Sequence, residues 1–338
     1  MQIGSVLLEN NLFVAPMAGV MDRPFRALCK RLGAGYAVGE MVTSKRELWQ
    51  SKKTAFRVNH EGEQGPIAVQ IAGTQPAEMA DAARFNIDHG AQIVDINMGC
   101  PAKKVCQKWA GSALMQDEKL AMAIIDAVVG VCALKNVPVT LKIRTGWSET
   151  KRNALSIAVA AQAAGVSMLT VHGRTREQGY RGDAEYDTVA RIKQAVKIPV
   201  VANGDIDSPL KAKWVLDRTG VDALMIGRAA QSRPWIFKNT HQFLLTGIMP
   251  EEPRTKEIRQ WMIEYLQDHY SFYGEYLGVR NARKHIGWLV QGLPDGHLLR
   301  QKINQVESAG AQICLVNDYI EKLEADYLFW PFPAAQSV

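Results

Sequence analysis

Short apolar runs alternate with amphipathic stretches along the first two thirds of the chain. Turn residues follow each run, and apolar residues at helical spacing follow the turn, which is the pattern of strand and helix in alternation. Helix starts are marked by Asp22 before Pro24, Thr74 before Pro76 and Ser208 before Pro209. The runs that we predict to be strands span residues 12–15, 36–40, 67–71, 93–97, 139–144, 168–172, 200–203 and 223–226.

A repeated segment marks the passage from helix to strand. Residues 90–97, 165–172 and 220–227 superimpose without gaps, and residues 33–40 fit the same frame. Each copy begins with a glycine that can cap the preceding helix and ends with a polar residue or glycine, at the point where a barrel strand opens into an active site. We therefore predict an α/β fold, a (β/α)8 TIM barrel over residues 1–245. A doubly wound sheet is the alternative, but it normally has fewer strands and a glycine-rich first turn.

The pattern changes after residue 245. Residues 246–253 contain Pro250 and Pro253 and indicate a linker, and helical spacing then continues toward the end of the chain. We predict a second domain over residues 246–338, a small bundle of three or four helices. The closing residues 329–333 contain two prolines, cannot extend a helix, and are expected to pack back or fray.

Composition narrows the class of protein. The chain is 47% hydrophobic and 22% charged, as in ordinary globular proteins. Residues 1–5 lack the basic start of a signal peptide, and the apolar run at 120–134 is interrupted by Asp126 and predicts a buried helix rather than a membrane span. Five cysteines without CxxC spacing or paired histidines favour neither disulfides nor a metal site, so we expect a cytoplasmic protein without a membrane partner.

The positive charge lies in the larger, amino-terminal part. Residues 246–338 contain nine Lys and Arg against twelve Asp and Glu, whereas the remainder contains 31 against 22. The predicted barrel therefore carries about +9, and the net charge of +6 permits a polyanionic partner. The second domain is not a basic RNA-binding tail.

Cys100 is the strongest candidate for catalysis. It follows the fourth predicted strand in the run Asn97-Met-Gly99-Cys100-Pro101, which places one thiol in a tight loop at the catalytic face. A thiol is mostly protonated near neutral pH and can act as a general acid. Asn97 beside it suggests recognition of a hydrogen-bonding edge such as that of a neutral pyrimidine. For the other cysteines we expect buried structural roles, although Cys106 shares the loop, and its oxidation with Cys100 is a hypothesis.

A second group of candidates follows strand five. Lys142 and Arg144 alternate with apolar residues, so both are expected to point into the pocket. A buried lysine needs a charged or electron-rich partner, which is either Asp95 of the neighbouring strand or the negative edge of a reduced flavin.

The ends of strands six, seven and eight predict a phosphate site. Gly204 and Gly227 follow strands seven and eight, where barrels of this kind commonly bind phosphate through backbone N–H groups. Arg228 or His172 can supply the positive charge. Met17, after strand one, can cover one face of a flat ring, and Gln70 can pair with its polar edge.

Taken together, these motifs closely resemble the tRNA-dihydrouridine synthases, in particular the bacterial B branch of that family. The resemblance covers nearly the whole chain and rests on residues 15–18, 95–104, 141–147, 172–175, 203–205, 226–228 and 282–285. It implies FMN as bound cofactor, NADPH as hydride donor, tRNA as partner, and no obligate protein partner. The FMN contacts that it implies are Pro16, Met17, Ala18, Gln70, Lys142, His172, Asn203, Gly204, Asp205, Gly227 and Arg228.

The resemblance also implies a reaction. NADPH reduces FMN, hydride passes to C6 of a flipped D-loop uridine, most simply at position 17, and Cys100 protonates C5. Asn97 matches the position that reads the uracil. As candidates for contacts to the tRNA backbone we name Arg144, Arg174, Arg176 and Arg181 of the barrel loops, with Arg283 and Lys284 of the helical domain.

Two other functions stay open from the sequence. A flavin barrel acting on a small pyrimidine or on dihydroorotate would share the phosphate loops and the catalytic thiol, but would not explain a helical domain beside a basic barrel. A flavin-free RNA-binding protein on a decayed barrel would not need Cys100, Lys142 and both phosphate loops.

Overall fold

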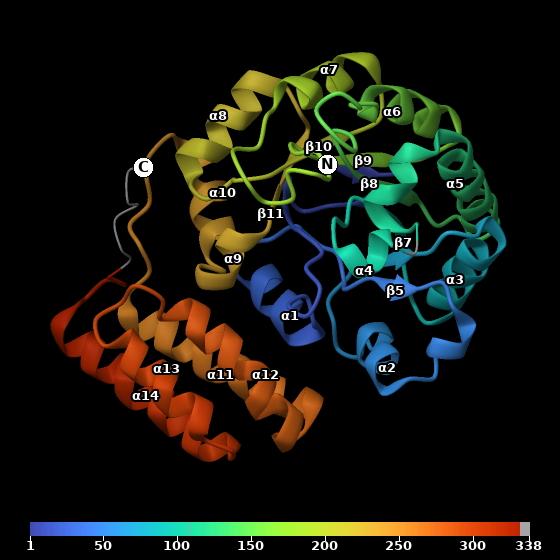
Figure 1. The fold of residues 1–338 in the computed structure, drawn as a ribbon. Helices are drawn as coiled ribbons and strands as arrows, with labels where there is room; N and C mark the ends of the chain where they lie inside the picture. Colours follow the sequence, from blue (N-terminus) through green and yellow to red (C-terminus); the bar gives the residue numbers. More distant parts are fainter. Residues whose placement is uncertain (108, 332–338) are drawn as a thin grey trace.

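The predicted strands form one closed parallel barrel in the computed structural model, which describes residues 1–107 and 109–331 (Figure 1). Each of the eight predicted runs contributes a strand, and neighbours along the chain pair in register. The strands are β3 Leu12–Val14, β4 Tyr36–Ala37, β6 Ala68–Ala72, β7 Ile93–Met98, β8 Val139–Arg144, β9 Met168–His172, β10 Val200–Asn203 and β11 Ala223–Ile226.

The barrel closes through an interrupted strand. The first and last strands pair directly, β3 with β11. Beyond β4, Val38 bridges Ala68 of β6, and the Gly39 N–H donates to the Ala68 carbonyl oxygen at 3.0 Å. Strand β5 (Val42–Thr43) then pairs with the far end of β6. Residues 36–43 thus act as one broken strand, and the doubly wound alternative is excluded because such a sheet has free edges.

Helices surround the barrel as the alternation predicted, and the glycines of the repeat have the cap conformation. Gly33, Gly90, Gly165 and Gly220 have φ values of +100°, +95°, +98° and +66°. Between the strands lie α1 Arg23–Arg31, η1 Arg46–Leu48, α2 Lys52–Val58, α3 Pro76–Asp88, α4 Lys103–Cys106, η2 Gly111–Gln116, α5 Glu118–Ala133, α6 Ala154–Ala163, α7 Asp187–Ala195, α8 Pro209–Thr219, α9 Arg228–Ser232 and α10 Ile236–Thr246. The long apolar run forms helix α5 as expected, but only one face of this helix is buried, so the prediction of a buried helix holds in part.

Two of the three predicted helix starts are confirmed. Asp22 accepts a hydrogen bond from the Phe25 N–H at 3.0 Å, and the Ser208 hydroxyl accepts one from Lys211. The third lies one residue further on, since Gln75 rather than Thr74 precedes α3 and its side chain makes no cap bond.

A short hairpin that the pattern did not predict closes the amino-terminal end of the barrel. Strands β1 (Gln2–Ile3) and β2 (Val6–Leu7) pair antiparallel, and Ile3 is fully buried against the first residues of the barrel strands, including Phe13. The opposite end, where the strands finish, is left for the site.

Four helices follow the loop after α10, at the upper limit of the prediction. They are α11 Thr255–Tyr273, α12 Glu275–Leu289, α13 Gly296–Gln305 and α14 Ala309–Asp326. In Figure 1 they lie beside α1 and α9 at one flank of the barrel. Among the described helices, none has the length and hydropathy needed to span a membrane.

The end of the chain packs back onto the barrel side of the bundle. Trp330 is 2% exposed, its ring centroid lies 6.3 Å from that of Trp235, and Phe329 forms a bridge with Arg254. Trp330 therefore packs rather than frays and the backbone of Phe329 is held by the bridge, although the Phe329 side chain is exposed. Residues 332–333 lie outside the described part.

Candidate active site

One large cavity opens at the carboxyl ends of the barrel strands, with a volume of ≈ 920 Å³. It gathers residues from all eight barrel strands or the loops after them, as a barrel active site does. Of the predicted site residues, it is lined by Pro16, Met17, Ala18, Gln70, Asn97, Cys100, Lys142, Arg144, His172, Asn203, Gly204, Asp205, Gly227 and Arg228. Arg174 is the one predicted site residue that does not line this cavity.

Cys100 lies at this cavity in a loop held from several sides. Its backbone N–H donates to Asn97 Oδ1 at 3.0 Å, and its carbonyl oxygen accepts from the Ser112 hydroxyl at 2.8 Å. Burial raises the pKa of the Cys100 thiol above its ordinary value. The thiol is therefore protonated at neutral pH and suited to give up a proton rather than to act as a nucleophile.

The other described cysteines do not line the cavity. Cys29 and Cys132 are fully buried, as expected, whereas Cys314 is exposed on α14, so the expectation of a buried role is wrong for that residue. Cys106 is buried behind the loop, with its sulfur 3.5 Å from the Cys100 carbonyl oxygen. Both thiols are free, and their joint oxidation stays a hypothesis.

Asn97 is tied into the protein. Its Oδ1 accepts hydrogen bonds from the N–H groups of Gly99 at 3.2 Å and Cys100 at 3.0 Å, and its Nδ2 donates to Gln70 Oε1 at 2.7 Å. Gln70 Nε2 in turn donates to Asp95 Oδ2 at 2.7 Å. Both amides thus hold the catalytic loop in place, a role that the sequence did not indicate.

Lys142 points into the barrel and donates to Asn203 Oδ1 at 2.9 Å. Burial, with the Arg144 charge beside it, lowers the pKa of Lys142 to about 8. The ion pair with Asp95 that the sequence left open is not among the ion pairs of the described residues, since the Asp95 carboxylate accepts from Thr140 and Gln70 instead. Lys142 therefore keeps N–H donors for a ligand in the cavity.

Arg144 binds backbone carbonyl oxygens of two loops at the cavity. It is 1% exposed, its Nε donates to the Gly99 carbonyl oxygen at 2.7 Å, and its Nη1 donates to those of Thr175 and Gly179 at 3.0 and 2.9 Å. Because the side chain is buried and three of its five N–H groups bind loop carbonyls, this geometry does not favour the predicted contact between Arg144 and a tRNA phosphate.

Arg174, which we predicted as a substrate contact, lies outside the cavity. It is 2% exposed and pairs with both carboxylate oxygens of Asp205, at 2.9 and 2.5 Å. Because it lies outside the cavity, the predicted substrate contact does not hold. The rim cations that do line the cavity are Arg176 and Arg181, with Tyr180 between them. Tyr180 was missed, although an aromatic residue directly before Arg181, in a segment that also contains Arg174 and Arg176, is a recognisable signal.

The predicted phosphate loops meet at the strand ends. Gly204 has φ +126°, and a Cβ there would lie 2.7 Å from that of Ala184, so the close turn requires glycine. Asp205 accepts from Arg228 at 2.6 Å. Burial, followed by the Lys142 charge, holds the pKa of His172 well below its ordinary range, so His172 is neutral. Of the two residues predicted to supply positive charge, the ligand-free structure therefore favours Arg228.

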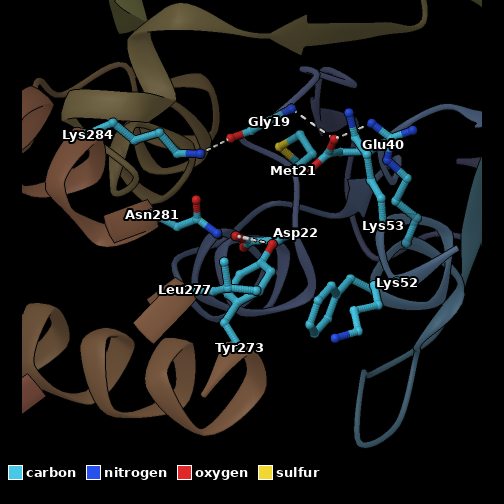
Figure 2. A pocket seen from close by; sticks show the side chains of 12 residues that line it. Gly19, Met21, Asp22, Glu40, Lys52, Lys53, Tyr273, Leu277, Asn281 and Lys284 are labelled. Carbon is cyan, nitrogen blue, oxygen red and sulfur yellow. Dashed lines mark hydrogen bonds and ion pairs between the residues drawn. The ribbon is translucent and has the colours of Figure 1, made fainter. Parts of the chain in front are cut away.

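A second cavity of ≈ 340 Å³ lies where the barrel meets α11 and α12 (Figure 2). The loop after β3 separates the two cavities: its residues 15–18 and Val20 line the first, while Gly19, Met21 and Asp22 line the second. Lys52 and Lys53 of α2 are exposed at this cavity. Lys284 of α12 donates to the Gly19 carbonyl oxygen across it, whereas Arg283 donates elsewhere, to the Val306 carbonyl oxygen.

A protonated thiol, oriented amides and a buried lysine at the carboxyl ends of barrel strands define a barrel enzyme that protonates a polar substrate. The family model described as dihydrouridine synthase matches residues 13–324. The chain belongs to the dihydrouridine synthase family, whose members are oxidoreductases that act on tRNA.

Relatives match over nearly the full length. The chain is 54% identical over 325 residues to tRNA-dihydrouridine synthase B of Xanthomonas axonopodis pv. citri (strain 306), covering 96% of this chain and 97% of that protein. It is 54% identical over 319 residues to that of Pseudomonas aeruginosa, with coverages of 94% and 95%. To that of Shewanella oneidensis it is 55% identical over 323 residues, with coverages of 96% and 99%.

Solved structures support the fold. An old yellow enzyme homologue from Zymomonas mobilis superimposes with a TM-score of 0.52 at 14% identity, covering 77% of this chain and 94% of that one. A 2-naphthoyl-CoA reductase complex superimposes with a TM-score of 0.54 at 14% identity. The match covers 72% of this chain and 51% of that one. At these identities the likeness concerns the barrel alone.

Proposed function

We propose that the protein reduces the C5–C6 double bond of a D-loop uridine in tRNA, at position 17, with FMN as bound cofactor, NADPH as hydride donor and Cys100 as the acid. The observation that carries this proposal is the single cavity-lining thiol, kept protonated by burial and held by Asn97. The position follows only from the likeness to the B-type synthases.

The donor set of the cavity fits a flavin mononucleotide. Lys142 offers an ammonium group to the electron-rich edge of the ring, and Gln70 offers its remaining amide N–H and lone pair to the polar edge. At the other end, a Cβ at Gly227 would have no atom closer than 3.6 Å outside its chain neighbours, so the backbone there is open to the cavity. Arg228 adds a cation beside it, and the two together suit a phosphate.

The remaining predicted cofactor residues close the cavity around that ligand. Pro16, Met17 and Ala18 form its wall after β3, where the Met17 carbonyl oxygen caps a turn by accepting from Val20 and Met21. Asn203, which binds Lys142 and the Met225 carbonyl oxygen, fixes the lysine's direction. Asp205 shapes the phosphate loop through its bonds to Arg174 and Arg228.

The chemistry that a bound flavin supplies in this cavity is hydride transfer, with NADPH as the source of electrons. Cys100 completes the addition by moving its thiol proton from Sγ to C5 of the uracil. Asn97 and Arg144 keep that sulfur in place through the backbone of residues 99 and 100. At the rim, Tyr180 offers a flat ring and Arg176 a positive charge, which suit the base and the phosphate of a nucleotide flipped out of its stack.

A tRNA, rather than a small pyrimidine, is supported by the second cavity. Lys52, Lys53 and Lys284 line it on the far side of the loop after β3, so a polyanion can run from the first cavity toward α11 and α12. We therefore assign residues 1–245 to catalysis and residues 246–338 to tRNA binding, in a cytoplasmic enzyme. A reductase of small pyrimidines is the alternative function.

Activity on bulk tRNA against free uracil tests the proposal. The purified protein should be yellow, should reduce tRNA with NADPH, and should lose tRNA affinity steeply between about 50 and 200 mM salt while flavin reduction is unchanged. Reduction of free uracil at a comparable rate, or a preparation that neither contains nor takes up flavin, would overturn it. Mapping dihydrouridine in tRNA from cells with and without the protein tests position 17.

A further inference from the structure

Three neighbouring strands place polar residues in one layer inside the barrel. Asp95 of β7 lies between two register partners. They are Gln70 of β6 and Thr140 of β8. The three are 2%, 3% and 0% exposed. A carboxylate in such a place is costly unless it is hydrogen-bonded. Asp95 has one bond on each oxygen, since Oδ1 accepts from the Thr140 hydroxyl at 2.6 Å and Oδ2 accepts from Gln70 Nε2 at 2.7 Å.

Hydrogen bonds run from this carboxylate to Cys100 in a fixed direction. Gln70 Nε2 donates to Asp95, so Gln70 Oε1 faces Asn97 and accepts from its Nδ2 at 2.7 Å. Asn97 Oδ1 is then left for the N–H groups of Gly99 and Cys100. The direction is imposed at both ends, because an ionised carboxylate only accepts and a backbone N–H only donates. Neither amide can be reversed without breaking a bond at one end.

We infer that Asp95 is a positioning residue, which acts through Gln70 and Asn97 to hold the backbone of Cys100 in place. The inference rests on the proposed role of Cys100 in uridine reduction. Asp95 contacts neither the thiol nor the cavity. Its contribution is an acceptor that orients two side-chain amides and, through them, two backbone N–H groups.

The ionisation of Asp95 agrees with this role at neutral pH. Burial raises the pKa of its carboxyl to about 6, while the bonds from Thr140 and Gln70 and the charge of Lys142 act to lower it. The groups that face it are Lys142 and Thr140 from β8, Gln70 from β6 and the buried phenol of Tyr36 from β4. The carboxylate is therefore mostly ionised near pH 7 and acts as an acceptor on both oxygens.

Two substitutions at one position separate the acceptor from the charge. Asp95→Asn keeps an acceptor for Gln70 Nε2 and can donate to the Thr140 hydroxyl, which also accepts. Asp95→Leu removes the acceptor and keeps the branched shape of the side chain, with methyl groups in place of the two oxygens. Both are made in a Cys314→Ser background, because Cys314 is the exposed cysteine and would otherwise react first.

The readout that does not need cofactor or tRNA is the rate at which iodoacetamide alkylates Cys100 in the folded protein. We expect Asp95→Leu to raise that rate by roughly tenfold, the change that about 1.4 kcal/mol produces, and Asp95→Asn to stay near the parent. In the complete reaction, Asp95→Leu should lower kcat for tRNA reduction without changing KM for tRNA.

Parent-like alkylation and kcat in folded Asp95→Leu would overturn the inference. So would equal damage in Asp95→Asn, because charge rather than hydrogen-bond direction would then be the cause. If Asp95→Leu does not fold, Gln70→Met breaks the same path at its middle link and should raise alkylation likewise; a parent-like rate there would also overturn it. If the parent neither holds flavin nor reduces tRNA, the proposed function fails, while the alkylation rates still decide the role of Asp95.

Discussion

Arg144 Nε donates a 2.7 Å hydrogen bond to the carbonyl oxygen of Gly99, the residue before Cys100. The same guanidinium binds carbonyl oxygens of Thr175 and Gly179, so one buried side chain joins the thiol's loop to the loop after β9. Asn97 also holds the loop of Cys100, by accepting a hydrogen bond from the Cys100 N–H.

Arg144→Met should therefore damage catalysis rather than binding. The variant keeps a long side chain but loses three hydrogen bonds to loop carbonyls. We expect kcat for tRNA reduction to fall by about 10- to 100-fold, equivalent to roughly 1.4–2.7 kcal/mol, with little change in KM for tRNA. Steady-state kinetics check this result. A large rise in KM with unchanged kcat would mean that Arg144 contacts the tRNA after all.

Cys100→Ala should keep flavin bound and reducible by NADPH but should not form dihydrouridine. In the proposed reaction the proton that C5 requires comes from the thiol, and no other described cysteine lines the cavity. Anaerobic flavin absorbance follows the reductive half-reaction, and tRNA-dependent reoxidation follows the second half. Cys314→Ser is the matched control and should behave as the parent. Near-normal dihydrouridine formation by Cys100→Ala would remove this thiol from the mechanism.

The pH profile of tRNA reduction should reflect the buried thiol. Burial raises the pKa of Cys100, so its proton is retained at a pH where an ordinary thiol, with a pKa of about 8.5, is already half ionised. We expect the rate of tRNA-dependent flavin reoxidation to decline only above that pH. Single-turnover rates across the alkaline range measure it. A decline centred below pH 8 or so would contradict a raised pKa.

Lys142→Met should weaken flavin binding or slow flavin reduction, because an ammonium group near the ring's electron-rich edge is lost. Burial and Arg144 lower the pKa of Lys142 to about 8, so in the ligand-free protein the charge is lost as the pH rises through that value. Flavin affinity of the parent should therefore fall above about pH 8, and that of Lys142→Met should not change there. Fluorescence titration with the flavin compares the two, and parallel profiles would count against the assigned role.

Reversing the charges at the second cavity should affect tRNA alone. The double variant Lys52→Glu, Lys53→Glu should raise KM for tRNA and leave flavin reduction unchanged. In a plot of the logarithm of the tRNA binding constant against the logarithm of the salt concentration, the slope should become shallower by about two. The control is Lys135→Glu, Lys197→Glu, which makes the same charge change at exposed positions before β8 and β10, at the other end of the barrel. If the two double variants affect tRNA binding equally, the net charge of the protein rather than the position of Lys52 and Lys53 is the cause.

His285 should set the acid sensitivity of the packing between the barrel and the helices. It is 3% exposed, and neither ring nitrogen has a hydrogen-bond partner in the described structure. Burial holds its pKa well below the ordinary range and lowers that of His269 to about 3. Because the unfolded chain binds these protons from about pH 6.5 downward and the folded one does not, stability should fall as the pH drops below that value.

His285→Leu should reduce this acid sensitivity and should raise Tm at acidic pH, since it removes one such group at similar volume. Asp22, whose pKa burial raises to about 6, favours the folded state on acidification, but it does so in parent and variant alike. Thermal unfolding at about pH 7 and pH 5 measures the difference. An unchanged difference in Tm between parent and variant at the two pH values would show that His285 does not contribute.

The sequence by itself determined the barrel and the identity of most cavity residues. Strand and helix periodicity is local, and the glycine at the head of each repeat requires a left-handed backbone wherever it lies. Since parallel strands end at one face, the residues after them had to meet there, and Cys100, Lys142 and Gly204 do so.

Tertiary structure alone decided which polar side chains are free to act. Arg144, Arg174 and Asn97 are residue types that often contact substrates, but most of their donors and acceptors are used by residues that come from other strands and loops. Hydrogen bonds of this kind depend on distances between segments far apart in the sequence, which periodicity does not carry. The sequence could not predict the charge state of His172 either, because burial lowers its pKa and burial is a property of the packed chain.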